Sequence, residues 1–427
     1  MSISKFKNIK MRYKILFVFV FSFLAIRICL SLDKKKEDAI LSKSNIIVPL
    51  SVTPASDAKI AVNTGVFGIN LGFGFSRELD KDSGFVQLLR ESHPSSLRFP
   101  GGTVANFYHP NLPGYGYKAT EIIPSLVGLY NLQKTRTENI LYNYIRLCKL
   151  ANTKALFCAN LLTGTTEEAL FVISELKKNN IPIEGVELGN EFCLMPYRKQ
   201  FPDVNSYIKK IKSTALAIRA KYPEIKLIVI AGDAVPIKDM NGRSKFMRAW
   251  NEALNKENFY DAYTWHTYPN CESCDKDAYF DNLYSKNLKE IAPQNTNNLY
   301  KSGFDYVLQY GKKRKLWVTE WNIGNFGFLD NTFTQAAYAS EFLLTMIDLN
   351  TKYENYFEVA NLHSIEGLIN DRKSKQKPVL TNGNDIATTQ YFAYKFLSST
   401  LTTDVYRASE KINCTDISVS KNFICNT

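Results

Sequence analysis

The sequence predicts an α/β fold, a (β/α)8 TIM barrel, and three observations point to it. Eight short apolar runs alternate along the chain with longer stretches of helical pattern, which is typical of parallel strands joined by helices. With 427 residues, of which 45% are hydrophobic, the chain is long enough to enclose such a barrel. The first run continues into Gly68–Gly74 without the GxGxxG order of a phosphate-binding loop, which disfavours an open doubly wound sheet.

The expected elements follow one another in regular order. The eight strand candidates are Val66–Leu71, Ser96–Phe99, Ala155–Asn160, Gly185–Gly189, Leu227–Ala231, Ala262–His266, Leu316–Glu320 and Phe357–Leu362. Helical stretches are expected at 135–150, 166–179, 204–221, 244–255, 300–311 and 334–349, and a further one at 389–397. The helix at 334–349 contains strong helix formers, and we expect Thr334 to cap it.

Polar side chains recur at the ends of these strand candidates. They are Asn70, Arg98, Asn160, Asn190, Glu191, His266, Tyr268, Glu320, Asn361 and His363. Because parallel barrels carry their chemistry at the carboxyl ends of the strands, the set predicts a functional site, although any one of these residues alone is better explained by loop solvation.

Glu191 and Glu320 are the central pair of this predicted site. Each follows a short apolar run, in Val186–Glu191 and in Leu316–Asn322. Hydrolysis of a glycosidic bond requires two carboxyl groups, one to protonate the leaving oxygen and one to attack the anomeric carbon or to activate a water.

Several motifs resemble those of one enzyme clan. Gly-Asn-Glu at 189–191 and Thr-Glu-Trp-Asn at 319–322 are similar to the motifs that follow strands four and seven in clan A glycoside hydrolases. Leu-Arg-Phe-Pro-Gly-Gly-Thr at 97–103 resembles the Arg-Tyr-Pro-Gly-Gly-Asn segment of family fifty-one α-L-arabinofuranosidases, and His-Thr-Tyr at 266–268 resembles their His-x-Tyr. The resemblance extends from residue 60 to about residue 400.

The resemblance implies a retaining mechanism on an exported oligosaccharide or polysaccharide. Glu191 would be the acid/base and Glu320 the nucleophile, with Arg98 keeping Glu320 ionised and Tyr268 orienting it. Asn190 would bind the sugar hydroxyl next to the anomeric centre.

Further residues are expected to bind substrate. Asn70 and His266 would contact the sugar, and the aromatic faces of Trp265 and Trp321 would stack on sugar rings, with core packing as the alternative for both tryptophans. The mechanism requires no metal and no cofactor, and the four scattered histidines do not suggest a metal site.

Two departures from the family pattern bear on substrate and architecture. Thr103 stands where the arabinofuranosidases use an Asn to bind sugar, and Asn70 stands where they have a glutamate. Their accessory β-sandwich is built from both chain ends, whereas few residues remain here after Leu397. We therefore expect a reduced or truncated β-sandwich element, with 39–62 as linker and accessory strands, 63–400 as the barrel and 401–427 as a carboxyl-terminal accessory segment.

The first 38 residues predict export. Their nine basic and three acidic residues contribute +6 of the net charge of +12, and they precede and flank an uncharged apolar stretch at 15–26. This pattern fits a signal peptide or an uncleaved membrane anchor, and lipidation at Cys29 is a weaker alternative because bulky Ile28 precedes it. We expect the rest of the chain to lie outside the cytoplasm, either secreted, periplasmic or on the cell surface.

Export also permits disulfides. Cys271 and Cys274 are expected to form a local disulfide, and Cys414 with Cys425 a second one. Cys148 and Cys158 are expected to be buried thiols.

Two other functional classes remain to be weighed. A nucleic-acid binder is disfavoured because the remaining charge is mild and forms no basic run. A non-catalytic glycan-binding or surface protein on a degenerate glycosidase barrel is the stronger alternative, although it would retain a carboxylate pair that serves no purpose and destabilises the fold.

Overall fold

The computed structural model describes residues 50–72, 78–134, 136–232, 242–268, 314–323, 331–352, 357–371, 380–382, 385–402 and 405–412. The leader, the helix expected at 300–311 and both expected cysteine pairs lie outside these residues. The chain divides into two compact units, one formed by Asn63–Ser399 and the other by Met1–Val62 with Thr400–Thr427.

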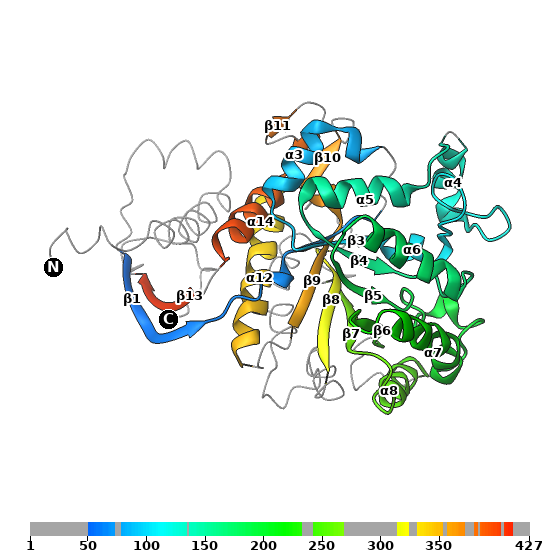
Figure 1. Ribbon diagram of the computed structural model, residues 1–427. Helices are drawn as coiled ribbons and strands as arrows, with labels where there is room; N and C mark the ends of the chain where they lie inside the picture. Colours follow the sequence, from blue (N-terminus) through cyan, green and yellow to red (C-terminus); the bar gives the residue numbers. More distant parts are fainter. Residues whose placement is uncertain are drawn as a thin grey trace. The chain divides into compact units, whose positions relative to one another are not determined.

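The larger unit is a closed barrel of eight parallel strands (Figure 1). The strands are β2 (Gly68–Asn70), β3 (Ser96–Phe99), β4 (Lys154–Cys158), β5 (Ile183–Glu187), β6 (Leu227–Ile230), β7 (Ala262–Thr267), β8 (Lys315–Trp321) and β9 (Phe357–His363). Each strand pairs with its neighbour in sequence, and β9 closes the ring on β2 with Leu362 opposite Ile69. All eight strand predictions and the predicted barrel are confirmed.

Helices follow the strands around the barrel. They are α3 (Ser83–Glu91), α4 (Val127–Gln133), α5 (Ile140–Ala151), α6 (Thr166–Lys178), α7 (Val204–Lys221), α8 (Gly242–Leu254), α12 (Phe333–Lys352), α13 (Ile365–Leu368) and α14 (Thr389–Thr400). Short 3-10 turns connect several elements, at η2 (Thr64–Val66), η4 (Leu79–Lys81), η5 (Gly102–Phe107), η6 (Pro124–Leu126) and η7 (Met195–Tyr197). Among the described helices, none combines the length and the apolar character needed to cross a bilayer.

Side-chain caps explain where several helices begin. Thr165 and Glu168 form a reciprocal capping box at the start of α6, and the Asn139 side chain accepts from the Leu141 amide at the start of α5. The expected cap of α12 at Thr334 is wrong by one half-turn. The helix α12 starts at Phe333 rather than after Thr334, so Thr332 takes the capping position. Its hydroxyl accepts from the backbone N–H of Gln335 at 3.3 Å.

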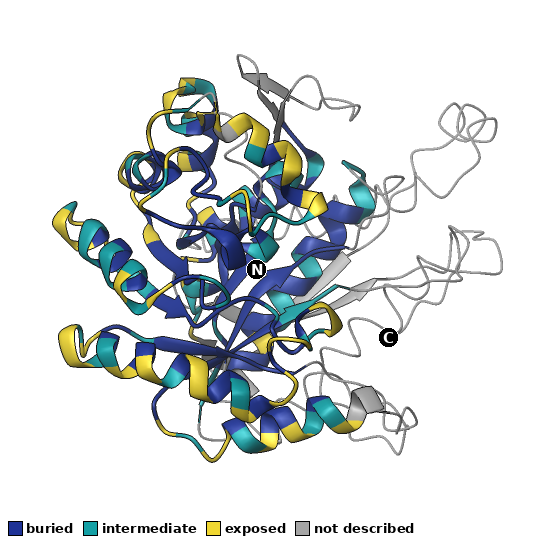
Figure 2. Ribbon diagram, turned by 90° about the vertical axis from the view of Figure 1, so that its right-hand side faces the viewer, coloured by how far each residue is buried: buried dark blue, intermediate teal, exposed yellow. Residues whose placement is uncertain are grey.

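The barrel strands are buried on both faces, and the covering helices are half-exposed (Figure 2). Leu156, Ile228, Ala262, Trp317 and Val359 form one apolar cluster with at most 1% exposure each. Gly185 makes room for this cluster, because a Cβ there would lie 2.6 Å from Ile228 and 2.8 Å from Trp317. Successive side chains of a strand point to opposite faces, so Glu187, two residues on, points to the same side as Gly185, one layer nearer the strand ends.

Two small sheets complete the described structure. Strands β10 (Ile369–Asp371), β12 (Asp385–Ala387) and β11 (Leu380–Asn382) form an antiparallel sheet in that order after β9. In the smaller unit, β1 (Leu50–Ile60) pairs antiparallel with β13 (Val405–Ile412). This pair is built from both chain ends, where the reduced sandwich was expected.

Candidate active site

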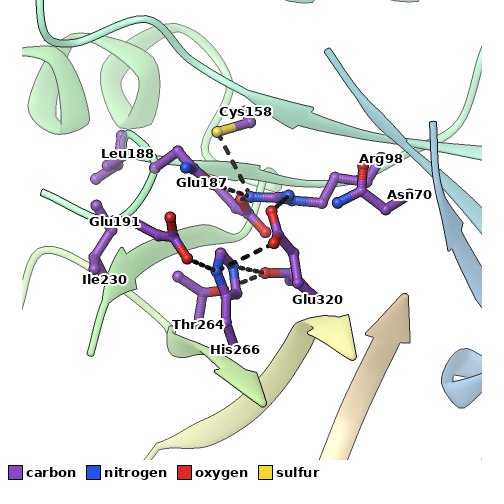
Figure 3. Close-up of polar contacts among 12 residues, drawn as sticks. Asn70, Arg98, Cys158, Glu187, Leu188, Glu191, Ile230, Thr264, His266 and Glu320 are labelled. Atoms are coloured by element: carbon purple, nitrogen blue, oxygen red, sulfur yellow. Dashed lines mark hydrogen bonds and ion pairs between the residues drawn. The ribbon is translucent and has the colours of Figure 1, made fainter. Parts of the chain in front are cut away.

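Five charged side chains from four strands meet at the carboxyl end of the barrel (Figure 3). They are Arg98 of β3, Glu187 of β5, Glu191 just after β5, His266 of β7 and Glu320 of β8. The closed parallel barrel brings these strand ends together although they are far apart in the sequence.

Arg98 is the cation at the centre of this cluster. Its side chain is fully buried, and its Nη1 atom donates to Oε1 of Glu320 at 2.7 Å. Its Nε and Nη2 atoms both donate to Oε2 of Glu187, at 2.9 and 2.6 Å. Nη2 also donates to Oδ1 of Asn190 at 2.9 Å. One planar guanidinium therefore fixes two buried carboxylates and an amide in a single geometry.

A tight turn after β5 presents Glu191 to the cluster. Gly189 and Glu191 both have positive φ, at +98° and +55°. A side chain at Gly189 would be strained by this φ and would displace the ring of Phe192, because a Cβ would lie 2.3 Å from that ring. The Gly-Asn-Glu motif thus reflects a turn that needs a glycine first and tolerates a strained glutamate third.

His266 joins the two glutamates of the predicted pair. Its Nδ1 atom lies 2.8 Å from Oε1 of Glu191 and 3.6 Å from Oε2 of Glu320, and its Nε2 atom lies 3.1 Å from the Thr319 hydroxyl. A carboxylate oxygen of Glu191, a ring nitrogen of His266 and a carboxylate oxygen of Glu320 all lie within 4.8 Å of one another. The two carboxyl groups thus face each other across one site.

The two glutamates occupy different environments. The Glu320 side chain is 6% exposed, whereas that of Glu191 is 28% exposed and reaches solvent. Burial alone would raise the pKa of Glu320, but the charges of His266, His363 and Arg98 and a hydrogen bond from the Tyr268 hydroxyl hold that pKa well below its usual value. Tyr268 donates to Oε2 of Glu320 at 2.6 Å.

The histidine responds to the same charges. Burial lowers the pKa of His266, but the neighbouring carboxylates of Glu320 and Glu191 outweigh it, so the pKa lies above the usual value. The Tyr268 hydroxyl shows the opposite trend to Glu320, because burial and the same carboxylate raise its pKa. Glu320 is therefore ionised at ordinary pH, and Tyr268 stays a hydrogen-bond donor.

Two buried amides near the cluster have donor atoms without a partner among the described residues. Nδ2 of Asn190 and Nδ2 of Asn70 are both fully buried and make no hydrogen bond there. The oxygen atoms of both amides are occupied, Asn190 by Arg98 and Asn70 by the Gly72 amide at 2.9 Å. Unpaired buried donors are costly, so both are suited to a polar ligand.

The tryptophans lie elsewhere. Trp321 has no exposed surface and stacks on Phe342 of α12, with ring centroids 4.4 Å apart. Trp265 is 7% exposed. Its neighbours Thr264 and His266 both contact Thr319, so they lie on one face of β7, and Trp265 between them points to the other face. The expectation that these rings line a sugar pocket is corrected for Trp321, which packs in the core because it alternates with Glu320 on β8. For Trp265, the alternation also points to core packing.

Several site residues escaped the sequence analysis. Glu187 is the most important, since it shares Arg98 with Glu320 and its side chain is 0% exposed. The signal was present, because a charged residue inside an otherwise apolar strand must be paired when that strand is buried. Thr319, which bonds His266, was missed as well. His363, one of the polar residues expected at the strand ends, lies at the end of β9 with Nδ1 4.0 Å from Oε2 of Glu320. Cys158, a buried thiol as expected, lies 3.9 Å from Arg98.

The cluster of Glu191, His266 and Glu320 also has the composition of a cation site. The Arg98 guanidinium already neutralises Glu320, and the Tyr268 hydroxyl occupies its second oxygen. A divalent cation would have to bind close to the positive charge of Arg98, which repels it. The arrangement therefore suits two carboxyl groups held by hydrogen bonds from neighbouring side chains better than a metal site.

A second charged cluster surrounds His109 in the long connection between β3 and α5. The imidazole is fully buried, with Nδ1 2.9 Å from Glu168 of α6 and Nε2 2.8 Å from Glu121. Burial lowers the pKa of His109, but the two hydrogen-bonded carboxylates raise it more, and the pKa values of Glu121 and Glu168 are lowered in turn. This buried ion cluster anchors the connection to the start of α6.

Comparison with protein-family models and with curated protein sequences gives no match. Solved structures do resemble the chain. A GH51 arabinofuranosidase from Xanthomonas axonopodis pv. citri superposes with a TM-score of 0.59 at 17% identity, over 86% of this chain and 79% of that one. A family 51 α-L-arabinofuranosidase from Bifidobacterium longum gives 0.60 at 12% identity, over 86% and 79%.

An α-L-arabinofuranosidase from Thermotoga maritima, solved with arabinose, gives a TM-score of 0.55 at 16% identity, over 86% of this chain and 76% of that one. Identities this low establish a shared fold and no more. The chain therefore shares its barrel fold with family 51 arabinofuranosidases.

Proposed function

We propose that this protein is a retaining glycoside hydrolase with Glu191 as acid/base and Glu320 as nucleophile. One observation carries the proposal: the carboxyl groups of Glu191 and Glu320 face each other with oxygen atoms within 4.8 Å. Retaining enzymes hold their two carboxyl groups about 5–5.5 Å apart, whereas inverting enzymes need about 6.5–9.5 Å to admit a water. The short separation supports direct attack by one carboxylate.

Glu320 is suited to be the nucleophile because it is buried, ionised and held in one orientation. Arg98 and Tyr268 each bond one of its oxygens, at 2.7 and 2.6 Å. In the first step a Glu320 oxygen attacks the anomeric carbon and the bond to the leaving oxygen breaks. The Arg98 charge keeps Glu320 ionised for this attack.

Glu191 is suited to move the proton because it is the more exposed carboxyl and shares a hydrogen bond with His266 at 2.8 Å. In the first step it gives its proton to the leaving oxygen. In the second step it takes a proton from water, whose oxygen attacks the anomeric carbon and releases Glu320.

The substrate class is a carbohydrate, and an arabinofuranoside is the first candidate. The unpaired Nδ2 atoms of Asn190 and Asn70 can donate to sugar hydroxyls beside the carboxylates. The structural relatives named above are arabinofuranosidases, which supports the candidate sugar. The chemistry needs only the two carboxyl groups and water, so the proposal includes no metal and no cofactor.

The alternative is a glycan-binding or surface protein that has lost activity on the same barrel. Such a protein has no use for a buried Arg98 that holds two carboxylates, because burying these charges is costly and a lectin needs no ionised nucleophile. This argument favours the enzyme.

We also propose that the first 38 residues carry the barrel out of the cytoplasm, as signal peptide or as membrane anchor. Fractionation of the native host tests this: recovery of the full-length chain as a cytoplasmic species contradicts it.

A screen of aryl glycosides, led by the α-L-arabinofuranoside, tests the activity with wild type beside Glu320→Gln. We expect release of the aryl alcohol by wild type and none by the variant. Binding of a glycan without hydrolysis by wild type, and with unchanged affinity in Glu320→Gln, would support the glycan-binding alternative instead.

A further inference from the structure

The Asn106 side chain is paired with the backbone of Asn190. Its Oδ1 atom accepts from the Asn190 amide at 3.1 Å, and its Nδ2 atom donates to the Asn190 carbonyl at 2.9 Å. Asn190 follows the end of β5, so neither group has a strand neighbour to pair with. The carboxamide thus takes the place of a neighbouring strand for this one residue.

The paired residue lies in the middle of the strained turn. Gly189 before it and Glu191 after it both have positive φ, at +98° and +55°. For Glu191 this backbone conformation is unfavourable by about 1 kcal/mol or more, so the surroundings must hold it. The two hydrogen bonds of Asn106 hold the peptide group before Asn190 and the peptide group after it. The peptide group after Asn190 is the one that joins it to Glu191.

Asn106 is itself held in place. It lies in η5 and is 0% exposed, and its Nδ2 atom also donates to the Tyr197 hydroxyl of η7 at 2.8 Å. Burial raises the pKa of Tyr197, so this hydroxyl stays protonated and neutral at ordinary pH. Asn106, which follows β3, therefore bonds two residues that follow β5. They are Asn190, just before Glu191 in the chain, and Tyr197, a few residues after it.

We propose that Asn106 is the positioning residue of the proton donor Glu191. This inference rests on the proposed function, and it adds a role for a residue that touches neither carboxylate. Asn106 holds the turn so that the Glu191 carboxyl meets the leaving oxygen and the imidazole of His266. On the nucleophile side of the site, Arg98 shares one bond with the Asn190 side chain, but Arg98 and Glu320 are held mainly by each other, by Glu187 and by Tyr268.

The two sides of the site predict different kinetic signatures. Loss of proton donation slows glycosides with poor leaving groups more than glycosides with good ones, because an acidic alcohol leaves without a proton. Damage to the nucleophile slows both classes. Asn106→Ala is therefore expected to behave as a weak version of a Glu191 variant.

Asn139→Ala is the matched control. Asn139 is also a buried Asn in this region of the fold, 6% exposed, and it bonds the Tyr108 hydroxyl, the His109 carbonyl and the Leu141 amide. It makes no contact with the Glu191 turn among its described hydrogen bonds. We expect a comparable loss of stability from both alanine variants, and a leaving-group effect from Asn106→Ala alone.

The kinetic arm measures kcat/KM for a 2,4-dinitrophenyl and a phenyl glycoside of the same sugar. We expect Asn106→Ala to lose at least about tenfold more on the phenyl glycoside than on the dinitrophenyl one, and Asn139→Ala to lose equal factors on both. Tyr197→Phe removes only the hydroxyl that Asn106 donates to, and is expected to shift the ratio in the same direction by a smaller factor. It serves as the test if Asn106→Ala does not fold.

A second arm needs no activity. The chain has four histidines, so the His266 resonance can be assigned by substitution and titrated by NMR. Glu191 raises the pKa of His266 through their hydrogen bond. A displaced Glu191 should therefore lower the apparent pKa of His266 in Asn106→Ala and leave it unchanged in Asn139→Ala.

Equal kinetic losses on both glycosides, or a wild-type titration of His266 in Asn106→Ala, would overturn the inference. If wild type hydrolyses no glycoside, the proposed function fails and the titration alone decides. A lowered pKa of His266 then still supports a positioning role for Asn106, and an unchanged one removes it.

Discussion

Arg98 and Glu320 are joined by one short hydrogen bond, 2.7 Å from Nη1 to Oε1, inside a barrel that buries both side chains. The bond depends on the planar fork of the guanidinium, because the other two donating atoms of Arg98 are occupied by Glu187 and Asn190. Arg98 therefore acts on both the charge and the orientation of Glu320, alongside the charges of His266 and His363 and the hydrogen bond from the Tyr268 hydroxyl.

Arg98→Lys is expected to lower kcat at least tenfold, which corresponds to about 1.4 kcal/mol of barrier. A lysine keeps the charge but cannot serve Glu187 and Glu320 together from one rigid plane. Steady-state kinetics on an aryl glycoside measure the effect, with a urea unfolding curve to show cooperative folding. Wild-type rates in a folded variant would remove Arg98 from the site.

Glu187→Gln is expected to impair both folding and activity. It leaves Arg98 buried with one counter-charge, and breaking one partner of a buried pair costs about 3–5 kcal/mol. The matched control is Glu184→Gln on the same strand, whose partner Lys154 is 54% exposed, and it should stay near wild type. If the two variants had equal unfolding midpoints in urea, Glu187 would have no special role.

The roles of the two glutamates can be separated. Glu320→Ala should abolish turnover of every glycoside because no covalent intermediate forms. Glu191→Ala should retain the first step for good leaving groups, and added azide should accelerate its second step by replacing the water that needs a base. Burst kinetics on a dinitrophenyl glycoside check this, and the assignment of the acid fails if good and poor leaving groups suffer equally.

The His109 cluster predicts a pH dependence of stability. The pKa of His109 is raised, so its contribution is complete below its unfolded value of about 6.5 and is lost as the pH rises through the folded value. The lowered pKa values of Glu121 and Glu168 make their contribution complete above about 4.5 and lost on acidification. The cluster should be strongest between these limits.

His109→Gln measures that contribution, which we expect to be about 2 kcal/mol near pH 5.5. The difference in unfolding free energy between wild type and variant should shrink above the raised pKa. Lys118 lies 3.3 Å from Glu121 in this cluster and is present in both proteins. Its contribution to the unfolding free energy therefore cancels in the difference between wild type and variant. A difference that stayed constant from pH 5 to pH 9 would show that His109 is not charged in the folded protein.

The sequence was a good guide to the barrel because a buried parallel strand is a short apolar run, a pattern visible without knowing its partners. The helices followed from caps and periodicity. The error at the start of α12 arose because one threonine, Thr332, precedes its first residue and another, Thr334, follows it. The carboxylate pair followed from motifs at strand ends. Glu187 and Asn106 did not, because their importance comes from partners 89 and 84 positions away, and those contacts arise only when the barrel closes.

Trp321 shows the opposite error. An aromatic residue beside a glutamate proposed to be catalytic invites a role in sugar stacking, but neighbours on a strand face opposite sides, and Trp321 packs on Phe342. Chemistry on one face of a strand predicts packing on the other.

The pairing of β1 with β13 has a consequence for how the chain is made. Leu50 pairs with Ile412 and Ile60 with Val405. The first described strand can therefore form this pairing only after the last described strand has been synthesised. In a chain that emerges amino end first, β1 is released early and keeps an unpaired edge throughout the synthesis of the barrel. Closing so long a loop is slow but not expensive in free energy, since its entropy grows only with the logarithm of its length. Until then, the unpaired edge of β1 is open to pairing with other chains, and a chaperone that covers it would prevent this.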